Sequence, residues 1–127
     1  MDDTKAVEPD KIYPLSDAAK ILDRSEKSLR ATKRRGLIEL VKSGDVIEIT
    51  GREIERYKRR PTKNGLYSYE NMLPYIPELT KEEFNDWVMR IQNEGRYRYE
   101  IQSFEGMELN LRLNAAQRLY ADMTLKK

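Results

Sequence analysis

Six basic side chains gather within twelve residues near the start of the chain, and they form the densest charge in the sequence. Residues 24–35 contain one acid, Glu26, against these six cations: Arg24, Lys27, Arg30, Lys33, Arg34 and Arg35. Lysine and arginine neutralise phosphates, which is the main source of affinity for nucleic acids. A run of charge is more often a solvated helix face, so the surrounding elements must decide between the two interpretations.

The basic segment also has the pattern of a short amphipathic helix. Ser25 is a favourable N-cap, the helix dipole favours the acid Glu26 in the first turn, and Gly36 is typical of the position after a helix. If Leu29 faces a core, a rotation of about 100° per residue turns these side chains outward: Lys27, Ser28, Arg30, Ala31 and Arg34. A helix of this size fits the major groove of DNA.

A first helix is expected just before the basic one. Ser16 can cap it, and its apolar residues recur at helical spacing, namely Ala18, Ala19 and Leu22. Only Asp23 and Arg24 separate it from the cap of the basic helix. Two short helices joined by so tight a turn are a helix-turn-helix.

A pair of strands is predicted after the basic helix. Residues 37–41 and 46–49 are rich in aliphatic and β-branched side chains, and the Gly-containing segment 42–45 between them suits a turn. This pattern predicts a hairpin that projects like a wing.

A third helix completes the first half. Thr50 and Glu53 have the spacing of a capping box, which marks a helix start, and Pro61 ends the helix. Residues 11–61 are therefore expected to form one small domain. This domain carries 14 basic and 8 acidic residues, whereas residues 62–127 carry 9 and 10.

This order of elements resembles the winged helix-turn-helix of the excisionase and MerR-type families. The resemblance covers roughly residues 12–60, and the matching segments are LSDAAKIL (15–22), SEKSLR (25–30), RRGL (34–37) and IEITGREI (47–54). It implies a domain that binds double-stranded DNA through the basic helix and the wing. The expected fold class is α+β, with a winged helix-turn-helix followed by a small helix, β-hairpin, helix domain.

Recognition helices present their N-terminal turns to the bases, so we expect the start of the basic helix to contact base edges and its end to contact the backbone. The residues expected nearest the bases are Lys27, Ser28 and Arg30, and those expected at phosphates are Arg34 and Arg35. The wing tip, with Lys42 and Ser43, is expected at phosphate or in the minor groove. The complete predicted DNA-binding set is Arg24, Lys27, Ser28, Arg30, Ala31, Lys33, Arg34, Arg35, Lys42 and Ser43.

We expect different structures for the remaining segments of the chain. Residues 1–10 offer little to bury and are expected to be a disordered tail, and residues 62–67 have the composition of a linker. Residues 68–127 are expected to form a domain that dimerises or binds a partner.

Within this second domain three helices and a hairpin are predicted. Ser68 caps a short helix, Thr80 and Glu83 form the capping box of a longer one that ends at Gly95, and Asn114 caps the last. Apolar side chains that share one face of the longer helix are expected in the core: Phe84, Trp87, Val88 and Ile91. Alternating residues predict a hairpin turning near Glu105, with an inner face of Tyr97, Tyr99, Ile101, Leu109, Leu111 and Leu113.

Composition argues against several kinds of chemistry. The chain has no cysteine and no histidine, so a zinc site is not expected and the usual general base is missing. The acids Glu82, Glu83 and Asp86 lie in the first two turns of a predicted helix, where the dipole explains them. We therefore expect no enzymatic activity, no cofactor and no metal. The sequence has no apolar run long enough for a membrane span, and we expect a cytoplasmic protein.

The function expected from these features is sequence-specific binding of double-stranded DNA. The protein would be an excisionase-like or accessory factor of a mobile genetic element, or a regulator of transcription. Its protein partners would be a recombinase, a replication protein, a polymerase or a second copy of the chain. Two alternatives stay open: a terminase small subunit or a replication or transfer accessory protein, and an adaptor whose winged helix contacts protein.

Overall fold

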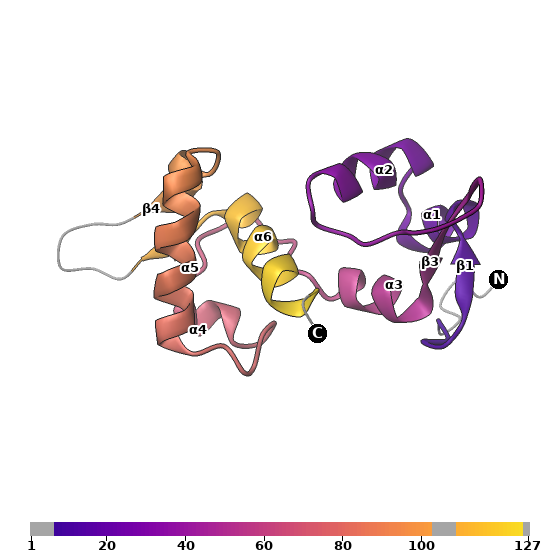
Figure 1. Ribbon diagram of the computed structural model, residues 1–127. Helices are drawn as coiled ribbons and strands as arrows, with labels where there is room; N and C mark the ends of the chain where they lie inside the picture. The colour runs from indigo at the N-terminus through magenta and orange to yellow at the C-terminus, as the bar shows by residue number, and fades with distance from the viewer. Residues whose placement is uncertain (1–6, 103–108, 126–127) are drawn as a thin grey trace. The chain divides into compact units, whose positions relative to one another are not determined.

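The computed structural model describes residues 7–102 and 109–125. It has mixed helix and sheet and is of the α+β class, as the sequence predicts (Figure 1). The chain divides into two compact units, Met1–Arg59 and Arg60–Lys127, and each packs around its own core.

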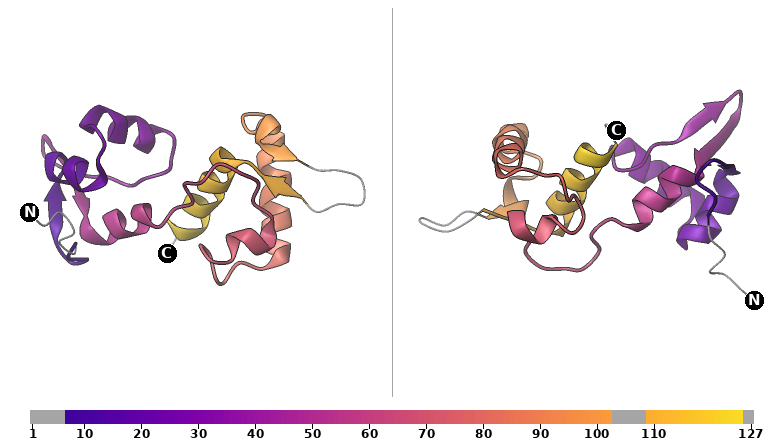
Figure 2. Two further views of the ribbon diagram at one scale, coloured as in Figure 1. Left: turned by 180° about the vertical axis from the view of Figure 1, so that it is seen from behind. Right: turned by 90° about the horizontal axis from the view of Figure 1, so that it is seen from below.

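The first unit combines three helices with a small antiparallel sheet. Its elements are β1 (Ile12–Pro14), α1 (Leu15–Leu22), α2 (Glu26–Arg34), β2 (Val41–Ser43), β3 (Val46–Thr50) and α3 (Gly51–Lys58). The three strands lie in the order β1-β3-β2, with β3 in the centre. Figure 2 shows the hairpin of β2 and β3 extending beyond the helices of this unit.

The core of the first unit forms where helices and sheet each contribute one apolar side. Ala18 of α1, Leu29 of α2, Ile49 of β3 and Ile54 of α3 have no exposed surface. The expectation that Leu29 faces the core is confirmed. Burying a leucine or isoleucine side chain contributes about 1.5–3 kcal/mol, so these contacts hold the short helices together.

The hairpin differs from the sequence prediction in its limits. Leu37 and Ile38 were expected in a strand but lie in the loop before β2, where both are buried in the core. Because the chain must first bury these two side chains, pairing starts only at Val41. Ser43 then pairs with Val46, so the turn is limited to residues 44 and 45.

Residues 7–10 are more ordered than predicted. Among residues 7–10 of the expected tail, Val7 is buried, and the Glu8 amide donates to the Tyr13 hydroxyl at 2.9 Å. The amides of Gly51 and Arg52, at the start of α3, donate to the carbonyls of Lys11 and Pro9. The prediction of a disordered tail is therefore wrong for residues 7–10, because the segment supplies acceptors to α3; residues 1–6 lie outside the described part.

The helix starts agree with the sequence prediction in some places and differ in others. Ser25 caps α2 through the Ser28 amide as expected, and Gly36 follows with a φ of 77°. Ser16, however, lies inside α1, whose N-cap is Pro14, and Asn114 lies inside the last helix. At both of these ends the helix extends further toward the N-terminus than the polar side chain suggested.

The second unit consists of helices around a two-stranded sheet. Its elements are α4 (Tyr69–Met72), α5 (Lys81–Glu94), the 3-10 helix η1 (Arg98–Glu100), β4 (Ile101–Gln102), β5 (Asn110–Leu111) and α6 (Leu113–Thr124). The capping boxes at Ser68 and Thr80 are both formed, the first with Asn71 and the second with Glu83. The expected α5 face is confirmed, since all four residues are at most 2% exposed: Phe84, Trp87, Val88 and Ile91.

The predicted hairpin of this unit is present only in part. Ile101 pairs with Leu111 as the expected inner face requires, but residues 98–100 form a 3-10 turn and not a strand. Tyr99 is therefore 81% exposed, and its assignment to the inner face is wrong. The expected turn near Glu105 lies outside the described residues.

Tyr67 was placed in a linker, yet it belongs to the second core. Its amide and carbonyl pair with those of Leu111, and its hydroxyl donates to the Lys63 carbonyl at 2.6 Å. Burial, reinforced by the neighbouring Tyr75, raises the pKa of the Tyr67 hydroxyl. An aromatic side chain after a run of linker residues was the feature that could have identified it as core.

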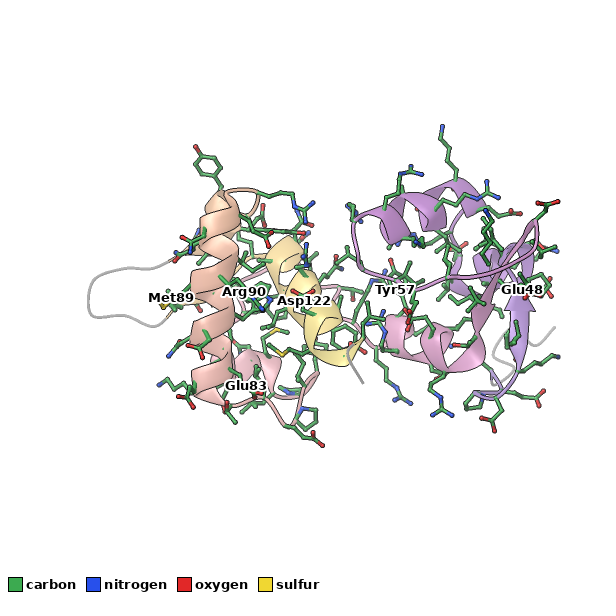
Figure 3. All side chains as sticks on the ribbon, in the orientation of Figure 1. Glu48, Tyr57, Glu83, Met89, Arg90 and Asp122 are labelled. Atoms are coloured by element: carbon green, nitrogen blue, oxygen red, sulfur yellow. The ribbon has the colours of Figure 1, made fainter. Side chains whose placement is uncertain are left out.

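A polar cluster crosses the second core between α5 and α6. The Trp87 indole donates to Asp122 at 2.8 Å, and Arg118 donates to the same carboxylate at 3.0 Å (Asp122 is labelled in Figure 3). Burial acts to lower the pKa of Arg118, but its bond to Tyr97 and the charge of Asp122 outweigh this and raise it. The cluster fixes α6 against α5.

The substitution Gly51→Ala tests the close approach of the N-terminal segment to α3. A β-carbon at Gly51 would lie 1.9 Å from the carbonyl oxygen of Glu8, so either the segment or the helix must move. We expect the free energy of unfolding in urea to fall by about 2–3 kcal/mol. In a chain that lacks residues 1–9 the same substitution should be neutral or stabilise by up to about 1 kcal/mol, because alanine favours helices. An equal loss in both chains would contradict this contact.

Candidate nucleic-acid interface

Helix α2 has one buried side and one cationic side. Leu29 and Thr32 are 0% and 1% exposed, so the opposite side of the helix faces solvent. The residues on that outer side are Lys27, Arg30 and Arg34, which are exposed, and Ala31, which is half-buried; Lys33 and Arg35 are exposed at its margins. Figure 3 shows nitrogen-tipped side chains projecting from α2 away from α3.

The helix is held as a continuous rod along its length. The Thr32 hydroxyl, buried against the core, donates to the Ser28 carbonyl at 2.8 Å. At the far end the amides of Gly36 and Leu37 donate to the carbonyls of Lys33 and Thr32. These bonds satisfy carbonyls that a helix end leaves without partners, and the rod therefore extends unbroken to Arg34.

Arg24 donates hydrogen bonds to Ser28 and to Tyr57 of α3. The Arg24 guanidinium donates to the Ser28 hydroxyl from Nε at 3.0 Å and from Nη2 at 2.6 Å, and it also donates to the Tyr57 hydroxyl. It also lies 5.8 Å from the centre of the Tyr57 ring (Tyr57 is labelled in Figure 3). Both predicted site residues are half-buried, in contrast to Lys27 and Arg30.

This network changes the prediction for Ser28. Its oxygen already accepts from Arg24, so only the hydroxyl proton remains to contact a base. Tyr57 is not among the predicted site residues, and the sequence contains no pattern that links it with Arg24, 33 residues away. A restrained guanidinium loses less entropy when it binds a phosphate, which makes Arg24 suited to a backbone contact.

The hairpin contributes less charge than the helix. Lys42 and Ser43 are exposed as predicted, but they lie in β2, and the turn itself is Gly44-Asp45. Lys42 is the single basic residue between residues 41 and 50, and Asp45 offsets it at the turn. The predicted placement of Lys42 and Ser43 at the tip is corrected: the register that pairs Ser43 with Val46 puts them on the strand.

A buried ion pair fixes the loop between α2 and β2. Arg56 contacts Glu53 at 2.6 Å, and their side chains are only 12% and 10% exposed. Glu53 also accepts from the Glu39 amide at 2.9 Å, while Arg56 donates to the Leu37 carbonyl at 2.9 Å. The sequence predicts a reciprocal capping box of Thr50 and Glu53. Thr50 does accept from the Glu53 amide, but the Glu53 carboxylate is engaged with Arg56 and the loop.

The sequence matches no protein-family model, and no curated protein or solved structure is significantly similar to it. In the described part of the chain no group of three or more acidic side chains is arranged to hold a metal ion. Nor does any helix there combine the length and the apolar character needed to cross a bilayer. The candidate site therefore rests on the geometry and charge of α2 and its supports.

The substitution Glu53→Gln tests whether the Glu53–Arg56 pair fixes the loop that follows α2. Removing one charge leaves Arg56 poorly compensated in a nearly buried position, so we expect a loss of about 2–3 kcal/mol in the free energy of unfolding. Hydrogen exchange at the amide of Glu39 should accelerate. Glu55→Gln is the matched control, since the ion pairs of Glu55 with Lys58 and Arg59 are longer and more exposed and should contribute less than about 0.5 kcal/mol. Equal losses in both variants would refute a special role for Glu53.

Proposed function

We propose that the first unit is a winged helix-turn-helix domain that binds double-stranded DNA, with α2 in the major groove and the β2–β3 hairpin as the wing. The observation that carries this proposal is the division of α2 into a buried side, Leu29 and Thr32, and an exposed cationic side. Such a helix can lie against base edges while its charges neutralise phosphates on both sides of the groove.

The position of each side chain along α2 suggests its role. Lys27 and Arg30, in the first two turns, would contact base edges. The short side chain of Ala31, one turn after Lys27, would allow a close approach to a thymine methyl group. The cations at the end of the helix would bind the backbone, namely Lys33, Arg34 and Arg35. Arg24, held by Ser28 and Tyr57, would bind phosphate, and Lys42 and Ser43 would contact the backbone from the wing.

The wider role is that of a cytoplasmic accessory factor without enzymatic activity. We propose that it acts for a mobile element, as an excisionase-like protein, or as a regulator of transcription. The second unit has its own aromatic core and would supply contacts with a second copy or with a recombinase, replication or polymerase protein.

A second candidate is an adaptor that binds protein through the sheet of the first unit. Ile12, Val41 and Val46 are 52%, 39% and 53% exposed. The register pairs Ile12 with Thr50, Val41 with Glu48 and Ser43 with Val46, which brings the three apolar residues to one face. Exposed apolar residues on one face favour protein contact, whereas α2 favours DNA.

The substitutions Arg30→Ala and Arg35→Ala test the DNA-binding function. Arg30→Ala should weaken binding to a selected duplex about 10-fold and relax its sequence preference, because a base contact is lost. Arg35→Ala should weaken selected and random duplexes alike and flatten the dependence of affinity on salt by about one phosphate contact. Arg52→Ala is the matched control, because Arg52 is exposed but lies at the start of α3 beside Asp10.

The measurement is a titration of labelled duplexes at two salt concentrations. The DNA-binding proposal requires affinity to fall steeply as salt rises, as expected for a helix with several phosphate contacts. Equal effects of Arg30→Ala and Arg52→Ala on the selected duplex would contradict the assignment of α2. Loss of a protein partner on replacing Val41 and Val46 by serine, with no DNA binding at any salt, would favour the adaptor.

A further inference from the structure

We propose that Glu26 and Arg30 form a specificity-determining pair that recognises a cytosine and an adjacent guanine in the major groove. The inference rests on the DNA-binding function proposed above and names part of the target that this function would select. It assigns a role in DNA recognition to Glu26, the one acidic residue of α2, whose charge opposes the binding of phosphates.

The two side chains are exposed together on successive turns at the start of α2. Their side chains are 46% and 50% exposed, and Arg30 Nη2 lies 4.0 Å from Glu26 Oε1. An exposed pair of this kind stabilises a helix only weakly, so both groups can exchange their contact for others at little cost. The separation of the two atoms is close to the spacing of neighbouring base pairs, about 3.4 Å.

The chemistry of the groove assigns a base to each group. Arg30 can donate two hydrogen bonds to O6 and N7 of guanine. The carboxylate of Glu26 only accepts, and cytosine presents an amino group as its donor in the major groove. Guanine and thymine present acceptors that repel a carboxylate, while adenine places the acceptor N7 beside its amino group. Cytosine is therefore the base that suits Glu26 best.

Glu26 has a simpler role that the experiment must separate from this one. An acid in the first turn is favoured by the helix dipole, and this effect does not depend on DNA. Its negative charge also opposes phosphate binding by the cations around it. Neutralising Glu26 should therefore increase the affinity for every duplex if the acid serves only the helix, but should decrease the affinity for the selected duplex if it contacts cytosine.

The substitution Glu26→Gln in the full chain distinguishes these outcomes, with selection from random duplexes and titration as the measurements. We expect affinity for the duplex selected by the unaltered protein to fall about 10-fold, and affinity for an unrelated duplex to rise. Preference at one position should change from cytosine toward adenine, because glutamine pairs with N6 and N7 of adenine. Glu26→Asp retains the acceptor and should retain the preference for cytosine.

Asp23→Asn is the matched control for charge. Asp23 is an exposed acid just before α2, and its φ of 56° suits asparagine equally well. The Asp23→Asn substitution should raise the affinity for both duplexes and leave the selected sequence unchanged. The same result for Glu26→Gln, in a protein that melts cooperatively, would overturn the inference and leave the DNA-binding proposal intact. If the unaltered protein selects no sequence, the proposed function itself fails.

Discussion

The burial of Leu29 against the core is the contact on which the rest of the first unit depends. Helices as short as α1, α2 and α3 are not stable in water by themselves, so each exists because one of its sides is covered. In α2 the covered side contains only Leu29 and Thr32. That narrow contact leaves most of the helix circumference exposed, and it fixes which residues face solvent.

Two polar networks supplement this small apolar contact at opposite ends of α2. At its start, Arg24 joins Ser28 to Tyr57 of α3; after its end, Glu53 and Arg56 of α3 hold the loop through backbone groups of Leu37 and Glu39. Helix α3 is thus the support for both ends. It is itself held by Ile54 in the core and by the carbonyls of the N-terminal segment, so residues 9–11 contribute indirectly to the position of α2.

The elements that could be predicted from sequence are those determined by neighbouring residues. Ser25 and Gly36 delimit α2, and Thr80 with Glu83 starts α5, because caps act within one helical turn. Contacts between residues far apart in the sequence could not be predicted. Strand β1 forms because residues 12–14 pair with β3. The Glu53 carboxylate does not cap α3, because it binds Arg56 and the backbone amide of Glu39 instead. Alternation of residue types at 97–101 predicted a strand, but pairing with β5 begins only at Ile101, and Tyr99 remains outside.

Some cations of α2 are explained by the stability of the helix alone, whereas Lys27 is not. Lys33 and Arg34 lie in the last turn, where the helix dipole favours a positive charge. Arg30 lies one turn after Glu26 on the same face and forms an ion pair with it. Lys27 is different, because a cation in the first turn opposes the dipole and lies one turn from Arg30, a like charge. Helix stability alone would therefore select against a lysine at this exposed position. The DNA-binding function proposed above would account for Lys27, since a base edge or a phosphate at the start of α2 would compensate its charge.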